Sequence, residues 1–328
     1  MNVRRALIIA VALLATAARA DALMFEELTQ DGHAILWLRD CGAKPEGSPC
    51  LSETTKFAAA GTYAAPTNTR RNYPGDAAVL QRYLERRRSS GGYYEIWLWS
   101  GGGSLDEGVE VGNVLHRYQA TVRVPTGMYC VSACTVAFMG ALFRYVDKGA
   151  TYEVHAYSQF SHPFEDEDGV QLRNRLLFDP EGELARQAED QQHGASGARY
   201  WAVRLFTFFQ RTLLPPGQEA RNGARLTRWQ TGEVPPLAYA KSQALREDAA
   251  RIRSEGLPAA QDILMRIERD SMDEALRGLR AILPELGPRA EPALRMLEAM
   301  FSSRITSTAS LSQETLLQMG YITKDFGR

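Results

Sequence analysis

Three groups of residues have types and spacing that suit nucleophilic catalysis. The glycines at 101–103 carry no side chains, so their backbone N–H groups can approach a substrate oxygen closely. Ser132 stands among small residues at a predicted helix start, where the helix N-terminus and the N–H of Ala133 favour developing negative charge. His155 comes 23 residues later on a predicted strand and supplies a general base. Together these groups predict hydrolysis by a serine nucleophile.

The elements that must position these residues alternate between strands and helices. Residues 94–99, 121–124 and 151–157 are short runs typical of strands in a covered sheet. Between them, apolar side chains recur at helical spacing over residues 111–118, and a second helix is predicted from Cys130 to about Tyr145. This alternation predicts a parallel α/β layer, in which the carboxyl ends of the strands carry the site.

Three stretches of this region resemble one known family. Residues 100–104 read Ser-Gly-Gly-Gly-Ser, residues 130–134 read Cys-Val-Ser-Ala-Cys, and residues 154–155 read Val-His. In this order they resemble the core of the Clp-type serine peptidases and their crotonase-fold relatives, most of all the secreted branch with a C-x-S-A-C motif. Residues 311–323 resemble the segment with which that family closes its core.

The resemblance implies a crotonase-like α/β core of repeated β-β-α units with one catalytic site. It implies these roles: Ser132 as nucleophile, His155 as general base, and the backbone N–H groups of Gly103 and Ala133 as oxyanion hole. The chain departs from the family at Gly101, where Clp-type enzymes usually have proline. It also lacks a carboxylate at 304–309, where the family keeps its triad aspartate.

Because no acid stands at 304–309, three outcomes stay open: a Ser-His dyad, a carboxylate recruited from elsewhere, and a lost activity. Glu298 is reachable in principle from the preceding helix, although we expect it on the solvated face of that helix. A Ser-Lys dyad would need Lys148, which we expect in an exposed turn. His162 could replace His155, although its Ser-His-Pro setting indicates a loop.

Residues 1–20 are typical of a cleavable secretory signal peptide. Arg4 and Arg5 precede an apolar run at 6–15, and Ala-Arg-Ala at 18–20 is an A-x-A cleavage site. The run is about half of the roughly 20 residues that a membrane-spanning helix needs, and no later stretch is long enough. An uncleaved anchor is the alternative. We expect an exported protein, periplasmic or secreted from a bacterium, with no membrane span after cleavage.

The exported chain carries four cysteines into an oxidising compartment, and four cysteines can pair as disulfides in three ways. Cys41 and Cys50 flank a loop rich in glycine and proline, so we expect a local bridge between them. Cys130 and Cys134 are too far apart for easy bridging in a regular helix, but a turn would bring their sulfurs together, and we favour a bridge. Catalysis by either thiol is disfavoured in that compartment. Metal binding is disfavoured too, since no further Cys or His has zinc spacing.

Composition excludes several classes of partner. Without Arg4, Arg5 and Arg19, 35 of the 38 basic residues face 39 acidic ones, so the mature chain has a formal net charge of −4. This balance gives no reason to expect a nucleic acid or an anionic membrane as partner. The acidic run at 165–168 lacks the spacing of a calcium loop. We therefore predict no metal and no cofactor.

The chain is expected to have a core at 21–234, a helical insertion at 235–303 and a closing segment at 304–328. In the insertion, a capping box at Ser271 predicts a helix start. We predict an exported serine peptidase that acts on peptides or unfolded protein, with homo-oligomerisation left open. The alternative is a catalytically impaired member that binds peptides or a partner protein. Acyl-CoA chemistry is disfavoured, because coenzyme A is not expected outside the cytoplasm.

Overall fold

The computed structural model describes residues 23–39, 75–155, 164, 167–194, 197–213, 239, 242–286, 290–302 and 309–324. The chain divides into two compact units, one of Met1–Val154 with Ser310–Arg328 and one of His155–Ala309. Strands dominate the centre of the first unit, and the described part of the second is almost entirely helical, so the architecture is mixed α/β. The predicted signal peptide, the Cys41–Cys50 pair and His162 lie outside the described residues.

The first unit contains a five-stranded sheet with the order β1-β2-β3-β4-β6. The neighbours from β2 to β6 pair in parallel, but β1 pairs with β2 antiparallel. The sheet is therefore mixed, and the parallel layer is extended by a hairpin at one edge. The strands are Met24–Gln30 (β1), His33–Arg39 (β2), Glu95–Trp99 (β3), Thr121–Val124 (β4) and Phe143–Val146 (β6). Two of the three strands predicted for the parallel layer lie in this sheet, whereas the predicted strand that begins at Thr151 lies in a second sheet.

The hairpin of β1 and β2 follows from a two-residue turn at Asp31 and Gly32. Both residues have positive φ, 50° and 79°. Two consecutive residues of this kind are characteristic of the tight turns whose twist matches that of paired strands, and Asp-Gly is a preferred sequence for them. The turn thus accounts for the antiparallel edge of the sheet.

A second sheet has the order β5-β7-β8, with β5 parallel to β7. The predicted helix from Cys130 to Tyr145 is wrong at both ends, because Cys130 lies in β5 and Tyr145 lies in β6. Uninterrupted apolar residues suit a buried strand and a buried helix alike, so their pattern alone does not separate the two. The elements are Tyr129–Val131 (β5), Ala133–Met139 (α4), Thr151–Val154 (β7) and Ala309–Ser310 (β8).

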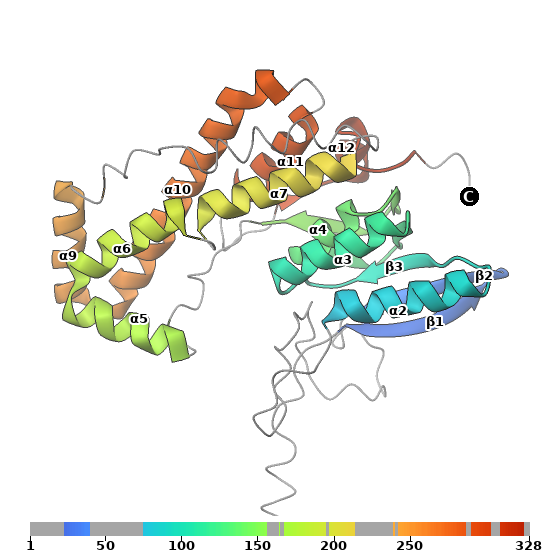
Figure 1. Ribbon diagram of the computed structural model, residues 1–328, viewed down its shortest axis with the longest axis horizontal. Coiled ribbons are helices and arrows are strands. Elements are labelled where there is room, and N and C mark those ends of the chain that lie inside the picture. Colours follow the sequence, from blue (N-terminus) through green and yellow to red (C-terminus); the bar gives the residue numbers. More distant parts are fainter. Residues whose placement is uncertain are drawn as a thin grey trace, which may run out of the picture. The chain divides into compact units, whose positions relative to one another are not determined.

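Helices α2 (Asp76–Ser89), α3 (Leu105–Arg117) and α4 lie side by side over the five-stranded sheet (Figure 1). Gly75 is the N-cap residue of α2, and Asp76 is the first residue of the helix. The core between helices and sheet is fully buried at Leu36, Leu38, Ile96, Leu98, Leu115, Val122 and Val124.

Helices α3 and α4 approach each other through glycines. A Cβ at Gly108 would lie 2.6 Å from the carbonyl oxygen of Ala133. A Cβ at Gly140 would overlap the carbonyl group of Gly112. Both positions therefore need glycine because the two backbones are in contact there.

The second unit is built around α10, the longest helix, which packs on α6 and α7 (Figure 1). Because α10 runs unbroken through Ser271, the predicted helix start at that residue is wrong. The helices are Glu167–Phe178 (α5), Pro180–His193 (α6), Ala198–Leu213 (α7), Gln243–Glu255 (α9), Leu257–Leu286 (α10) and Glu291–Ser302 (α11).

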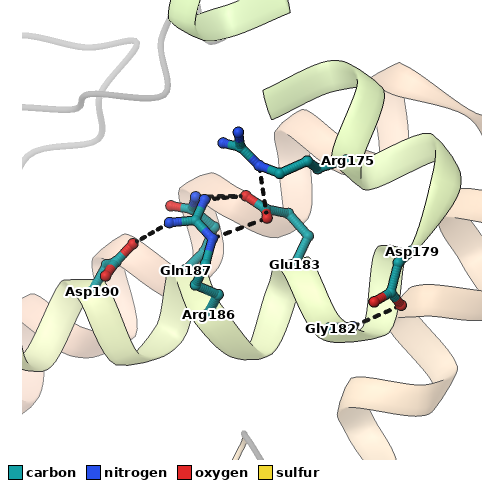
Figure 2. Close-up of polar contacts among 7 residues, drawn as sticks. All are labelled: Arg175, Asp179, Gly182, Glu183, Arg186, Gln187 and Asp190. Carbon is teal, nitrogen blue, oxygen red and sulfur yellow. Dashed lines mark hydrogen bonds and ion pairs between the residues drawn. The ribbon is translucent and has the colours of Figure 1, made fainter. Parts of the chain in front are cut away.

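A buried carboxylate joins α5 to α6 in this unit. Arg175 and Arg186 both donate through Nε to the same oxygen of Glu183 at 3.0 Å, and Gln187 donates to the other oxygen at 2.9 Å (Figure 2). Burial acts to raise the pKa of Glu183, but these hydrogen bonds and arginine charges outweigh it, so the pKa is lowered. Glu183 is therefore ionised in the folded protein at neutral pH.

The C-terminal segment returns to the first unit. The amide of Gln313 donates to the carbonyl oxygen of Val146 at 2.7 Å, and Tyr321 is fully buried. The backbone N–H of Thr323 donates to the carbonyl oxygen of Arg144, also at 2.7 Å. Within the described ranges, no helix has both the length and the apolar character needed to cross a bilayer.

Candidate functional site

Ser132 occupies a sharp turn between a strand and a helix. It follows the last residue of β5, Val131, and is the N-cap residue of α4. Its backbone angles, φ 58° and ψ −127°, lie where residues with a side chain are rarely found. Its backbone N–H donates to the carbonyl oxygen of Glu153 at 3.1 Å, and its own carbonyl oxygen accepts from the N–H of Thr135 at 2.9 Å. The turn is thus held from both sides in a strained conformation, the kind that presents a nucleophilic serine at a strand-to-helix junction.

A disulfide closes over this turn. Cys130 and Cys134 are bonded, with their Cα atoms 5.3 Å apart, and both side chains are fully buried. The bridge predicted between them is confirmed. It is sterically accessible because Cys130 lies in β5 and only Cys134 lies in the helix, with the turn at Ser132 between them.

The glycine run reaches Ser132 because Ser100, directly after β3, forms a parallel bridge with Cys130 in β5. The N–H of Ser100 donates to the carbonyl oxygen of Tyr129 at 2.9 Å, and the N–H of Val131 donates to that of Ser100 at 3.0 Å. The next residues of the run therefore lie beside the turn. A Cβ at Gly102 would lie 2.5 Å from the Cβ of Ser132.

The backbone donors near Ser132 can be sorted by the bonds that they make. The N–H of Gly102 donates to the buried hydroxyl oxygen of Ser100 at 3.1 Å, so it is already engaged. The same virtual Cβ of Gly102 would lie 3.0 Å from the backbone nitrogen of Ala133. The structure therefore brings the glycine run and Ala133 together. Gly103, at φ 132°, follows directly, and its role as the second donor stays a prediction.

A buried carboxyl group fixes the helix that leaves the glycine run. Ser104 caps α3 by accepting from the N–H of Glu107. The side chain of Glu107 in turn accepts from the N–H of Ala77, at the start of α2, at 2.6 Å. Burial raises the pKa of Glu107, and the nearby carboxylates of Glu110 and Asp106 raise it further. The hydrogen bond from Ala77 lowers it, but the net pKa is raised.

His155 is the first residue after β7. Because β5 and β7 are parallel and pair Val131 with Glu153, Ser132 and His155 both follow the carboxyl ends of neighbouring strands. The sequence placed His155 inside the third strand, which in fact ends at Val154. The boundary between the two units falls between Val154 and His155, so the proposed base begins the second unit.

The other predicted candidates lie elsewhere. Lys148 is exposed in a turn that precedes the amino end of β7, whereas Ser132 follows the carboxyl end of the neighbouring strand, so the two do not form a dyad. Glu298, on α11, forms an ion pair with Arg280. Among the described residues, no three His, Cys, Asp or Glu side chains are grouped so as to hold a metal ion.

Sequence reasoning gave no separate role to two residues of this site. Gly102 is the glycine nearest Ser132, and Ser100 anchors the run through its hydroxyl and both backbone groups. A signal for Ser100 was present, since a small polar residue directly after an apolar strand often binds a neighbouring backbone group.

No family model, curated protein or solved structure matches this chain. Any function proposed for the chain therefore rests on Ser132 and the backbone around it.

Proposed function

We propose that the chain is an exported serine hydrolase, a peptidase for peptides or unfolded protein, with a core related to the Clp and crotonase folds. Ser132 is the nucleophile and His155 the general base. The N–H groups of Gly103 and Ala133 stabilise the oxyanion. The observation that carries the proposal is the strained turn at Ser132, held between β5 and α4 with the glycine run against it.

The chemistry follows the order of serine acyl transfer. His155 takes the proton of the Ser132 hydroxyl as the oxygen attacks the substrate carbonyl, and the two N–H groups bind the resulting oxyanion. His155 then protonates the leaving group, and water releases the acyl chain from Ser132. Because the chain lacks an acid at 304–309, we expect turnover to be slow, since the missing carboxylate can cost about 10⁴ in kcat.

Export is supported by the disulfide over Ser132, because such bridges persist in oxidising compartments. A second candidate function is binding of peptides without turnover, and the lack of an acid at 304–309 favours it. The two functions differ in whether Ser132 reacts.

A fluorophosphonate probe tests the proposal directly. We expect the mature protein to be labelled at Ser132 and the Ser132→Ala variant to remain unlabelled while keeping the same circular dichroism spectrum. Equal labelling of both proteins would remove Ser132 from its role. Absence of labelling in both, with peptide binding retained, would select the binding function.

A further inference from the structure

A cavity of about 270 Å³ lies in the first unit, away from the glycine run. Its walls come from the carboxyl ends of α2 and α3 and from the amino ends of β3 and β4, whereas the glycine run follows the carboxyl end of β3. The 13 residues of α3, about 20 Å of helix, separate the two places. The side chains that give the cavity its character are three arginines and three tyrosines: Arg87, Arg88, Arg117, Tyr93, Tyr94 and Tyr118.

The three arginines carry more positive charge than the carboxylates near them offset. Arg86, the neighbour that does not line the cavity, pairs with Glu27. In contrast, none of the three cavity arginines forms an ion pair with a residue that the structure describes. Glu85 lies nearby, but Gln81 and Tyr118 donate to it, at 2.7 Å and 3.0 Å, and it is not part of the cavity wall. Three positive charges against one negative charge leave an excess of two.

These arginines are not needed to cap the helices that carry them. The carbonyl oxygens of Arg87 and Arg88, in the last turn of α2, accept from the backbone N–H groups of Gly92 and Gly91 at 3.1 Å and 2.9 Å. In the last turn of α3, the carbonyl oxygen of Leu115 accepts from the N–H of Ala120 at 2.9 Å. Because backbone donors satisfy these carbonyls, the arginine side chains are not tied to the helix ends. Nη1 of Arg117 donates to the side-chain oxygen of Gln81 at 3.3 Å, and its other guanidinium nitrogens form no hydrogen bond with a described residue.

Arg87 is held in place before any ligand arrives. Its side chain lies against Gly92, where an added Cβ would be 2.5 Å from Nε of Arg87. The same Nε donates to the carbonyl oxygen of Tyr93 at 3.4 Å. Its guanidinium group stands 5.3 Å from the ring centre of Tyr94. Its two terminal nitrogens form no hydrogen bond with the described residues. Beside it, the ring of Tyr93 is 80% exposed and offers a flat apolar surface.

We propose that this cavity binds a small molecule that carries a phosphate or carboxylate next to a ring or other flat apolar group. Guanidinium groups bind both oxyanions through paired, charge-assisted hydrogen bonds. Tyr93 supplies the stacking surface for the apolar part. The site is independent of the hydrolase chemistry proposed for Ser132, because none of its residues belongs to that machinery.

Phenyl phosphate is the probe, with titration calorimetry on the full mature chain as the measurement. We expect phenyl phosphate to bind more tightly than inorganic phosphate, and benzyl alcohol not to bind. The Kd for phenyl phosphate should rise about tenfold in Arg87→Gln and in Arg117→Gln. It should stay unchanged in Arg82→Gln, which removes the same charge from an exposed position of α2 outside the cavity.

A second variant tests the same proposal if an arginine variant fails to fold. Tyr93→Ala changes an exposed side chain, so we expect it to fold and to bind phenyl phosphate no better than inorganic phosphate. Unchanged affinity in the Arg87 and Arg117 variants would overturn the proposal, as would equal binding of benzyl alcohol. Binding to phosphatidylglycerol vesicles without binding of soluble phenyl phosphate would overturn it in favour of a membrane surface.

Discussion

The Cβ of an alanine at position 102 would lie 2.5 Å from the Cβ of Ser132. Gly102 also has a φ of 101°, which residues with a side chain rarely adopt. We therefore expect Gly102→Ala to reduce fluorophosphonate labelling of Ser132 at least tenfold and to lower the melting temperature. Gly127→Ala is the matched control, since its φ is 76° but no atom lies within 4 Å of the added Cβ. Equal losses in the two variants would mean that backbone strain alone, and not contact with Ser132, is responsible.

Ser132→Gly should be more stable than Ser132→Ala. Both variants lack the nucleophile, but only glycine adopts φ 58° and ψ −127° without strain, which costs other residues about 1–3 kcal/mol. The flexibility of glycine in the unfolded chain offsets about 0.5–1 kcal/mol of this gain. Denaturant unfolding of the two variants measures the difference. A less stable glycine variant would show that the turn relaxes when the hydroxyl is absent.

The disulfide over the turn should contribute about 2 kcal/mol to the free energy of unfolding, the value that chain entropy gives for so short a loop. We expect the double variant Cys130→Ala with Cys134→Ala to lose this amount and to label more slowly with the probe. The matched control is Cys41→Ala with Cys50→Ala, away from the turn in sequence. Mass mapping of the exported chain checks the predicted Cys41–Cys50 bridge in the same preparation. Unchanged labelling in the first variant would show that the bridge does not support Ser132.

Glu183 should make the second unit sensitive to acid. Its pKa is lowered in the folded state, so its contribution is complete above the unfolded value of 4.5 and is lost as pH falls through the folded value. Because Arg175 and Arg186 are nearly half exposed, we expect Glu183→Gln to cost only about 1–2 kcal/mol at pH 7 and less at pH 3. Urea unfolding at both pH values measures this. Glu189→Gln, exposed on the same helix, should change nothing at either pH.

Glu107 should behave in the opposite direction. Its pKa is raised mainly by burial, so folding becomes less favourable as pH rises through the folded value. Glu107→Gln keeps an oxygen to accept from the N–H of Ala77 but carries no buried charge. We expect the variant to be as stable as the parent at pH 4, below the unfolded value of 4.5, and more stable at pH 8, measured by urea unfolding. A variant that is less stable at pH 8 would show that the charge itself is needed at the start of α2.

The parts of the fold that the sequence predicted are those with regular patterns. The strand at Glu95–Trp99, the glycine run and α3 follow one another as expected, because a short apolar run and helical spacing are local signals. β5 was missed because three residues are too few for an alternating pattern. The β1–β2 hairpin was also missed, although Asp31 and Gly32 carried a recognisable turn signal.

The candidate site was only partly accessible from the sequence. The positions of Ser132, the glycine run and the 130–134 bridge were predicted from residue types. The positive φ of Ser132 was not, because it is imposed by the hydrogen bonds to Glu153 and Thr135 rather than by local preference. Likewise, the contact between Gly102 and Ser132 depends on the bridge between Ser100 and Cys130, which no local pattern predicts.

The glycine contacts between α3 and α4 set more than the packing of two helices. The glycine run leads into α3, and Ser132 leads into α4. The spacing of the helices, fixed at Gly108 and Gly140, therefore fixes the distance between Gly103, one of the two proposed oxyanion donors, and Ser132. A single methyl group at Gly108 or Gly140, which are 24 and 8 residues from Ser132 in sequence, would widen that gap. Substitutions along α3 and α4 are thus limited by the space that the tetrahedral carbon of the reacting substrate needs, and not only by the stability of the core.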